Sequence, residues 1–550
     1  MLCLLLLLSQ AGPDAAVPVT VATPNDAAAP NDAAAPNDAA APAAAARPNI
    51  LFAISDDQSY PHCSAYGCDW TYTPAFDRVA AGGLLFTRCY TPNAKCAPSR
   101  AIVLTGRNSW QLGAAANHVA FFPPEQPVFP EQLASAGYDV AFTGKGWAPG
   151  VALTADGSER LLTGRRYGRR KQTPPTKAIS NNDYAGNFAD FLDDHAIADA
   201  DRSQPWCFWY GGTEPHRRYE YGTGAELGDK AIGQIERVPA FWPDSPVVRN
   251  DMLDYALEIE HFDRHLGRML DDLDRRGELE NTIVVVTSDN GMPFPRSKGQ
   301  TYELSHHMPL AISWPRGIAA PGRTIDDFVS FVDFAPTFLD AAGIGEAMPM
   351  TGRSLRPIFE SDRSGRVDPG RDGVILGKER HDLGRPRDAG YPSRGLVTER
   401  WLYTVNERPD AWPAGNPETG YMNTDGSPTK TQILTLRRDG TDRRYWEQCF
   451  GRRPRIELFD RSADPDCLVN LAGVAAYAET ERTLATRLRE VLTSQNDPRA
   501  TGQWADGVTD FDQYPYSQER LKGFYEKFTG GENVRAGWIE PTDIETAPVE

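Results

Sequence analysis

The sequence predicts an α/β fold: a mostly parallel sheet covered by helices on both faces, with a smaller C-terminal α+β domain. Two observations lead to this prediction. Short apolar runs, typical of buried parallel strands, alternate along the N-terminal half with segments of helical periodicity. Each of these runs also ends in polar side chains, and parallel sheets bind ligands at the carboxyl ends of their strands.

Four apolar runs are predicted to be strands of this sheet. They are RPNILFAIS at 47–55, AGYDVAFTGKG at 136–146, WCFWYGGTEPH at 206–216 and NTIVVVTSDNG at 281–291. Three segments between or beside them have the spacing and end signals of helices. These are TPAFDRVAAGG at 73–83, PEQLASAG at 130–137 and the long segment at 250–277. Strands joined through helices run in parallel, so their carboxyl ends meet at one edge of the sheet.

We expect two folded domains in the chain of 550 residues. Residues 47–371 are predicted to form the large α/β domain that holds the functional site. Residues 372–550 are predicted to form an α+β subdomain and tail, with an amphipathic helix around 479–492. The segment LKGFYEKF at 521–528 is a candidate for a short final helix.

The start of the chain indicates export. The apolar run MLCLLLLLSQAG is too short for a stable membrane span, which needs roughly 20 residues. Residues 1–22 are therefore interpreted as an export signal, although a basic n-region is missing; the alternative is a non-exported chain with an apolar start. Residues 23–46 contain three Pro-Asn-Asp-Ala-Ala-Ala units and are predicted to be a spacer. We expect a periplasmic or secreted protein.

Charge and cysteine content limit the partners and the chemistry. The formal net charge of −18 argues against nucleic acid as a partner, and it means that any anion site must be built locally. The eight cysteines include no close CxxC pair of the kind that binds zinc. Without Cys3 and Cys96 an even number remains, which an oxidising compartment can pair. The candidate pairs are Cys63–Cys68 and Cys449–Cys467; free buried thiols are the alternative.

Oxygen-bearing side chains collect at two of the predicted strand ends. Asp56 and Asp57 follow the first strand, and Asp289 and Asn290 follow the fourth. At ~4 Å and an effective dielectric of about 20, two carboxylates repel by about 4 kcal/mol, so protons or a cation must offset the charge. Oxygen ligands favour a hard divalent ion such as calcium or magnesium. The alternative is that these residues only form turns.

Basic side chains near the same edge form a candidate anion site. Lys145 and His216 end the second and third strands, and Arg100 lies in a first helical turn, where free backbone N–H groups favour an anion. Together with Lys298 and a divalent ion, these residues would hold a tetrahedral oxyanion such as sulfate or phosphate. Taken alone, Lys145 would be interpreted as solvated surface.

The stretch NAKCAPSRAIVLTGR at 93–107 contains the pattern Cys-x-Pro-Ser-Arg-x-x-x-Leu-Thr-Gly without a gap. It resembles the signature of the type I, formylglycine-dependent sulfatases of the alkaline phosphatase superfamily. The resemblance spans about residue 47 to the segment RIELFDRSADPDCLVNLAG at 455–473. Within that family, SDNGMPFPRSK at 288–298 and TGRSLRPIFE at 351–360 look most like the heparan N-sulfatases, or sulfamidases, and their bacterial relatives.

The resemblance implies a role for each candidate residue. Cys96 would be oxidised to formylglycine by a formylglycine-generating enzyme, and the hydrated aldehyde would be the nucleophile. Calcium, with magnesium as the alternative, would be bound by Asp56, Asp57, Cys96, Asp289 and Asn290. The residues that hold the diol and the sulfate group would be Arg100, Lys145, His216 and Lys298. The implied substrate is a sulfated carbohydrate such as a heparan-type glycosaminoglycan.

One position departs from the family pattern. Many sulfatases have a histidine two residues after the lysine, as the base that deprotonates the diol, whereas this chain has Trp147 in GKGW. His118, His306 and His307 are candidate substitutes, and each can equally be interpreted as a core or surface histidine. Trp147 is itself a candidate for stacking on a sugar ring.

Two basic segments are candidate contacts for a sulfated polysaccharide. They are GRRYGRRK at 164–171, with a solvated loop as the alternative, and the pair Arg217–Arg218 beside His216. The favoured hypothesis is hydrolysis of a sulfate ester or sulfamate on a glycan. The alternatives are a phosphodiesterase or phosphonate hydrolase on the same fold, and a glycan-binding homologue that has lost catalysis.

Overall fold

The frame of the molecule is a nine-stranded mixed sheet, in a computed structural model that describes residues 47–199, 203–345 and 347–549. The strand order is β10-β2-β9-β8-β1-β7-β4-β6, and β11 pairs with β2. The strands are β1 (Asn49–Ser55), β2 (Leu84–Tyr90), β4 (Asp139–Gly144), β6 (Arg165–Tyr167), β7 (Trp206–Gly211), β8 (Thr282–Ser288), β9 (His307–Ser313), β10 (Arg323–Ile325) and β11 (Val329–Ser330). The four strands predicted from the sequence are β1, β4, β7 and β8, and they are confirmed.

The centre of the sheet is parallel. β1 pairs in parallel with β8 on one side and with β7 on the other, and β7 pairs in parallel with β4. β9 runs antiparallel to both β8 and β2. The prediction of a mostly parallel sheet is confirmed.

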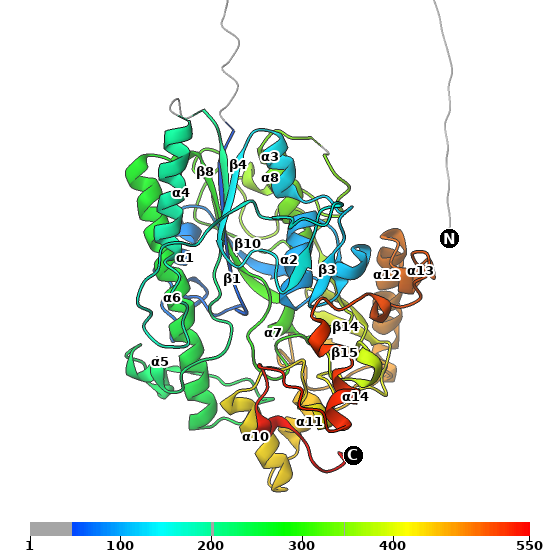
Figure 1. Ribbon diagram of the computed structural model, residues 1–550. Coiled ribbons are helices and arrows are strands. Elements are labelled where there is room, and N and C mark those ends of the chain that lie inside the picture. The colour runs from blue at the N-terminus through cyan, green and yellow to red at the C-terminus, as the bar shows by residue number, and fades with distance from the viewer. Residues whose placement is uncertain (1–46, 200–202, 346, 550) are drawn as a thin grey trace, which may run out of the picture. The chain divides into compact units, whose positions relative to one another are not determined.

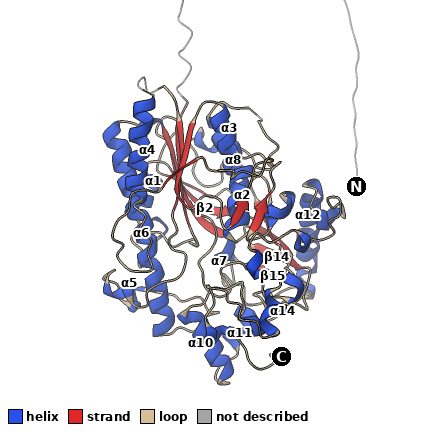
Figure 2. Ribbon diagram, in the orientation of Figure 1, coloured by secondary structure: helices blue, strands red, loops and turns tan. Residues whose placement is uncertain are grey.

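Helices pack on both faces of this sheet (Figures 1 and 2). The helices near the sheet are α1 (Pro74–Ala81), α2 (Cys96–Thr105), α3 (Phe129–Ser135), α4 (Tyr184–Ala198), α5 (Thr223–Glu226), α6 (Pro246–Arg276), α7 (Glu303–His306), α8 (Phe334–Ala341) and α9 (Arg356–Phe359). In β1, Phe52 and Ile54 pack with residues of α2, α3 and α8, whereas Leu51 and Ala53 pack with residues of α1, α4 and α6. The alternation follows from the two-residue period of a strand, and burial on both faces explains the continuous apolar run.

The long helix α6 begins and ends where its sequence signals predict. Ser245 accepts a hydrogen bond from the Val248 N–H as N-cap, and Pro246 occupies the first helical position. Gly277 ends the helix with a φ of 69°, in the left-handed region that glycine adopts at little cost. α6 lies along one side of the molecule in Figure 1.

A separate antiparallel sheet follows in the C-terminal part. Its strands, in order, are β12 (Gly373–Lys378), β13 (Ser393–Thr398), β14 (Trp401–Asn406) and β15 (Ile456–Asp460), and a small third sheet joins β3 (Ala120–Phe122) to β5 (Gly150–Ala152). The remaining helices are α10 (Pro428–Arg438), α11 (Arg444–Phe450), α12 (Ala478–Ser494), α13 (Pro498–Thr501) and α14 (Phe524–Thr529). Leu484, Leu488 and Leu492 of α12 pack in one cluster with Leu396 and Leu458 of the sheet. The predicted helices at 479–492 and 521–528 are confirmed as α12 and α14.

Several predictions concern residues or features outside this frame. The export signal (1–22) and the spacer (23–46) lie outside the described residues, and the domain division at residue 371 stays a prediction. None of the helices in the described part of the chain is both long and apolar enough for a membrane span. The described cysteines are all free and buried, so the candidate disulfides are not formed. Each of those four thiols is instead packed in a hydrophobic cluster.

Candidate active site

The predicted metal ligands lie at the adjacent ends of β1 and β8. Ser55 pairs with Ser288 at the last position of the two parallel strands, so the residues that follow them lie side by side. The Asp57 N–H donates to Asp289 Oδ1 at 3.1 Å, and Asn290 Nδ2 donates to Asp57 Oδ1 at 2.7 Å. The side chains that follow the two strands therefore lie next to one another, as the parallel pairing of β1 and β8 requires.

Cys96 is the first residue of α2 and is 1% exposed. Its Sγ lies 3.9 Å from Asp57 Oδ1. Pro98 fits in the first turn because the N–H groups there have no partner within the helix. Gly106 ends α2 with a φ of 65°, in the region that favours glycine. The spacing of the signature thus fixes both ends of a short helix whose first residue faces the carboxylates.

Ser99 and Arg100 tie this helix to the sheet. Ser99 Oγ donates to the Asp289 carbonyl at 2.5 Å, and Arg100 Nε donates to Asp289 Oδ2 at 2.7 Å. Arg100 Nη1 also donates to the Lys145 carbonyl at 2.7 Å. One fully buried guanidinium therefore links α2 to the ends of β8 and β4.

Two lysines offset part of the negative charge. Lys145 Nζ lies 2.6 Å from Asp56 Oδ2, and Lys298 Nζ lies 2.6 Å from Asp57 Oδ2. Burial by itself raises the pKa of Asp56, but the Lys145 charge, helped by other cations, outweighs burial and holds that pKa below its ordinary value. Burial first, and the Asp56 charge second, raise the pKa of Asp289. The basic residues therefore do not neutralise the whole group of carboxylates.

The donor atoms fit a divalent cation. Asp56 Oδ1 and Asn290 Oδ1 are buried, and neither has a hydrogen-bond partner among the described residues. One ligand atom each from Asp56, Asp57, Cys96 and Asp289 lies within 4.8 Å of the others. A hard cation would coordinate the unpartnered buried oxygens and would neutralise the excess negative charge. The cluster is a candidate acidic metal site.

His216 lies beside this cluster at the edge of a cavity. Its Nδ1 donates to the Arg217 carbonyl at 2.6 Å, and its Nε2 is 3.7 Å from Asp57 Oδ2. The cavity has a volume of about 370 Å³. Its lining includes Asp56, Cys96, His118, Lys145, Thr213, Glu214, His216, Arg217, Arg218 and Glu258. The predicted site residues are thus brought together, part of them on the cavity wall and part behind it.

Sequence reasoning missed three charged residues of the site. Asp425 accepts from Lys298 Nζ at 2.9 Å, so the ammonium lies between two carboxylates. Lys95, directly before Cys96, has its Nζ 2.5 Å from Asp382 Oδ2. The place of Lys95 next to the signature was a signal that could have identified it. Asp382 and Asp425 come from loops of the C-terminal part, where no local pattern marked them.

Trp147 makes contacts within the protein through its indole N–H and its ring. Its indole Nε1 donates to the Ala97 carbonyl at 2.9 Å, and its ring meets Phe122 edge to face with centroids 5.2 Å apart. The side chain packs against the hydrophobic cluster between the sheet and α2. This arrangement supports the start of α2 and argues against the sugar-stacking role considered from the sequence.

His306 and His307 lie behind the site rather than in it. His306 Nδ1 donates to the Thr91 carbonyl at 2.7 Å. The His307 ring is stacked between Tyr60 and Tyr90, with centroid distances of 3.9 and 4.5 Å. Of the substitute histidines considered from the sequence, His118 is the one that lines the cavity with Cys96.

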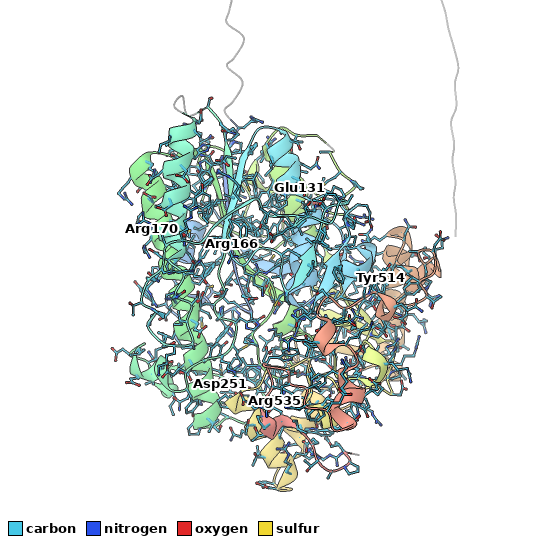
Figure 3. The ribbon with its side chains drawn as sticks, viewed as in Figure 1. Glu131, Arg166, Arg170, Asp251, Tyr514 and Arg535 are labelled. Carbon is cyan, nitrogen blue, oxygen red and sulfur yellow. The ribbon has the colours of Figure 1, made fainter. Side chains whose placement is uncertain are left out.

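The basic segment at 164–171 belongs to the edge strand β6 and the loop after it. Arg165 pairs with Asp139 at 2.9 Å, and Arg170 pairs with Asp190 at 2.7 Å. Figure 3 labels Arg166 and Arg170 in this segment. Residues 165–169 line a different hollow, together with acidic residues of α4. These pairings favour the solvated-loop interpretation of the segment.

Arg217 and Arg218, which follow His216, have different surroundings. Arg217 is buried and makes a two-pronged ion pair with Asp251 of α6, at 2.7 and 2.8 Å; Asp251 is labelled in Figure 3. The side chain of Arg218 is 65% exposed at the cavity, with its nearest carboxylate, Glu540, at 3.5 Å. Arg218 is therefore the arginine of the pair that is accessible to a ligand.

Comparison with known proteins identifies the family. The sulfatase family model matches residues 48–344, which is more than half of the chain and includes all of the residues at the two strand ends, the signature helix and the basic groups around them. The chain belongs to the sulfatase family. It is therefore assigned to the sulfuric ester hydrolases, and the signature resemblance noted in the sequence is confirmed.

The similar sulfatases cover most of the chain. An N-acetylglucosamine-6-O-sulfatase of Bacteroides thetaiotaomicron is 27% identical over 544 residues, covering 82% of this chain and 88% of that protein. Human N-sulphoglucosamine sulphohydrolase is 27% identical over 491 residues, covering 82% and 91%. A solved structure described as a complex with D-glucosamine-2-N,6-O-disulfate matches with a TM-score of 0.56 at 23% identity, covering 82% of this chain and 98% of that one. At that identity the structural match shows the fold alone.

The contact of Trp147 gives a first testable prediction. Trp147→Phe keeps an aromatic ring but removes the indole N–H, so the free energy of unfolding should fall by about 1 kcal/mol, the usual net value of one hydrogen bond. The KM for a sulfated substrate should stay unchanged. Urea denaturation and steady-state kinetics measure the two effects, with Trp504→Phe as the matched control. A raised KM at unchanged stability would restore the sugar-stacking role.

Proposed function

We propose that the chain hydrolyses sulfate esters or sulfamates on a sulfated glycan, using formylglycine made from Cys96 and a bound calcium ion. The position of Cys96 carries this proposal. As the first residue of α2 it belongs both to the group of candidate ligand atoms and to the wall of the cavity. A nucleophile there would meet substrate from the cavity while the carboxylates and basic residues surround it from behind.

The surroundings of Cys96 support its conversion to another group. Burial, followed by the Asp56 charge, raises the pKa of the Cys96 thiol well above its ordinary value, so the thiol is a weak nucleophile here. Because the side chain is 1% exposed, a modifying enzyme has to act before the chain folds. The proposed partner in maturation is a formylglycine-generating enzyme that reads the Pro98-Ser99-Arg100 segment in the extended chain.

The basic residues would act on the sulfuryl group. Lys145 and Lys298 hold its oxygens while a hydroxyl of the hydrated residue 96 attacks sulfur, and one such donor is typically worth roughly 2.7–4 kcal/mol. His216 Nε2 donates a proton to the departing oxygen or nitrogen. The second hydroxyl of residue 96 then loses its proton, which expels sulfate and restores the aldehyde. A serine or a thiol has no second hydroxyl and would stay sulfated.

The proposed metal site uses Asp56, Asp57, Asp289 and Asn290, with residue 96 beside them. Calcium is proposed over magnesium because the site offers several carboxylates, and calcium accepts such ligands in irregular geometry more readily than magnesium does. When bound, the ion would supply positive charge that acidifies the neighbouring hydroxyl and stabilises the sulfuryl oxygens.

The cavity supports a carbohydrate substrate. Its volume of about 370 Å³ is at the small end of ligand pockets, and the exposed Arg218 stands at its wall. The two relatives named above act, by their names, on sulfated glucosamine derivatives. A heparan-type glycosaminoglycan is the substrate that we propose for this chain, and His216 is able to protonate either an O- or an N-linked leaving group.

We also propose that the protein is exported, to the periplasm or outside the cell. Its apolar start and the following Pro-Asn-Asp-Ala-Ala-Ala units support this location. Polymeric sulfated glycans would meet the enzyme there without having to cross a membrane.

The second prediction concerns residue 96 directly. Mass spectrometry of the peptide that contains Cys96, from protein made in its native source, should find the aldehyde in place of the thiol. Peptides containing the buried Cys89 and Cys207 are internal controls and should keep their thiols. An unmodified Cys96 in native-source protein with normal turnover would contradict the proposed mechanism.

The third prediction concerns the metal. At free calcium of about 100 times its Kd, binding should raise the free energy of unfolding by about 2.7 kcal/mol, so chelation should lower both Tm and turnover. Calcium should restore both, and magnesium should restore less. Asn290→Ala should weaken the calcium-dependent rise in Tm, whereas the surface variant Asn281→Ala should keep it. Equal Tm with and without calcium would exclude this site.

The fourth prediction separates the functional alternatives. With equal concentrations of an aryl sulfate and an aryl phosphodiester, kcat/KM should be higher for the sulfate. The phosphodiesterase hypothesis is not favoured, because the two relatives that match four-fifths of the chain are named as a sulfatase and a sulphohydrolase. A preference for the phosphodiester would overturn this choice. Binding of heparan fragments without any turnover of the modified protein would indicate the glycan-binding homologue.

A further inference from the structure

His118 is a buried histidine that lines the active-site cavity and has one ring nitrogen without a partner. The residue is 8% exposed and lines the cavity together with Cys96, Lys145 and His216. Its Nδ1 donates to Asp382 Oδ1 at 2.8 Å. Its Nε2 has no hydrogen-bond partner among the residues that the structure describes. A buried nitrogen without a partner needs an explanation, and a role toward the substrate supplies one because the residue lines the cavity.

The contacts around His118 fix it relative to residue 96. The second oxygen of Asp382 lies 2.5 Å from the ammonium of Lys95, the residue directly before Cys96. One carboxylate therefore connects His118 to the start of α2. The backbone is held as well, because the His118 N–H donates to the Arg380 carbonyl at 3.0 Å.

The same contacts set the protonation state. Lys95 pairs with Asp382 and offsets its negative charge. Asp382 is therefore less able to stabilise a protonated His118 ring. Burial first, and the charges of Lys95 and Lys298, lower the pKa of His118 to about 4, although Asp382 acts in the opposite direction. The ring is thus neutral at physiological pH. With its Nδ1–H directed to Asp382, Nε2 carries the lone pair that accepts a proton.

Three other polar groups near residue 96 are engaged elsewhere. The indole N–H of Trp147 is bonded to Ala97, and an indole has no basic nitrogen. Lys145 is bound to Asp56. Glu214 accepts from the Ser180 N–H at 2.8 Å and from the Tyr184 hydroxyl at 2.9 Å. His216 is assigned above to the leaving group, so the release of sulfate from residue 96 needs another base.

We propose that His118 is the base that releases sulfate from residue 96, and that Asp382 positions it; this inference rests on the proposed function. His118 Nε2 takes the proton of the second hydroxyl, and the O–H electron pair becomes the new C=O bond. The C–O bond to the sulfuryl group breaks, and sulfate departs with that electron pair. The imidazolium returns its proton to water when the aldehyde is hydrated again.

The fifth prediction tests this step by separating attack from release. In His118→Gln, an aryl sulfate should still give a burst of about one phenol per active site, because attack is intact. Steady-state turnover should then fall by about 10²–10⁴-fold, the usual contribution of a general base. Mass spectrometry of the peptide with residue 96 should find a sulfuryl group attached, which the wild-type protein does not accumulate.

The matched control is His195→Gln. His195 is also buried, at 7% exposed, and is bonded to a carboxylate, Asp139, at 3.2 Å, but it lies on α4 and does not line the cavity. It should keep wild-type turnover and no sulfated peptide. His118→Ala is the second variant, since added imidazole can enter the space left by the ring and should restore turnover. Circular dichroism checks that each variant is folded.

Asp382→Asn tests the positioning residue. It should accumulate the same sulfated peptide and lower kcat more than it raises KM. The double variant with His118→Gln should be no slower than His118→Gln alone, because the two residues act as a unit.

Three outcomes overturn the inference. Normal turnover in His118→Gln with an aldehyde at residue 96 removes the base role and leaves the proposed function standing. Loss of the burst together with turnover, or a raised KM without a sulfated peptide, would make His118 a substrate-binding residue instead. A wild-type protein with an unmodified thiol and no turnover would overturn the proposed function and this inference together.

Discussion

The concentration of negative charge at the ends of β1 and β8 is the constraint on which the rest of the site depends. Two adjacent parallel strands bring Asp56, Asp57 and Asp289 together without solvent around them. Such a group is stable only if basic residues or a cation approach from other directions, and removing one partner of a buried ion pair costs about 3–5 kcal/mol. Arg100 and Lys145 supply that charge from different elements. The contacts that hold the elements together therefore also offset part of the negative charge of the site.

Much of this arrangement was readable from the sequence because it depends on strand ends. The apolar runs identified β1, β4, β7 and β8. Because the carboxyl ends of parallel strands meet at one edge of a sheet, Asp56, Asp289 and Lys145 were expected to lie together. The signature placed Cys96 at a helix start for a local reason, since a proline in the first turn and a glycine at the end define the helix. The roles of these residues stay proposals that the experiments above decide.

The parts that the sequence did not reveal depend on long-range packing. Asp382 and Asp425 are carried by loops of the C-terminal part, and no periodicity says that these loops meet residues before and after the signature. The direction of the Trp147 indole is likewise set by the Ala97 carbonyl, which lies 50 positions earlier in the chain. The cysteines are a further example. Their nearness in sequence made disulfides one of two candidate arrangements, and in the structure these thiols are separate and buried.

The burial of Cys96 has a consequence for how active molecules arise. If Cys96 can be oxidised only while the signature is still extended, folding and modification compete once in each chain. After folding, the state of residue 96 can no longer change. A molecule that folds too early has the complete architecture, with its ion pairs and cavity intact, and is permanently inert. The specific activity of a preparation would then report the kinetics of maturation in the host that produced it. Purity and correct folding alone would not guarantee a working enzyme.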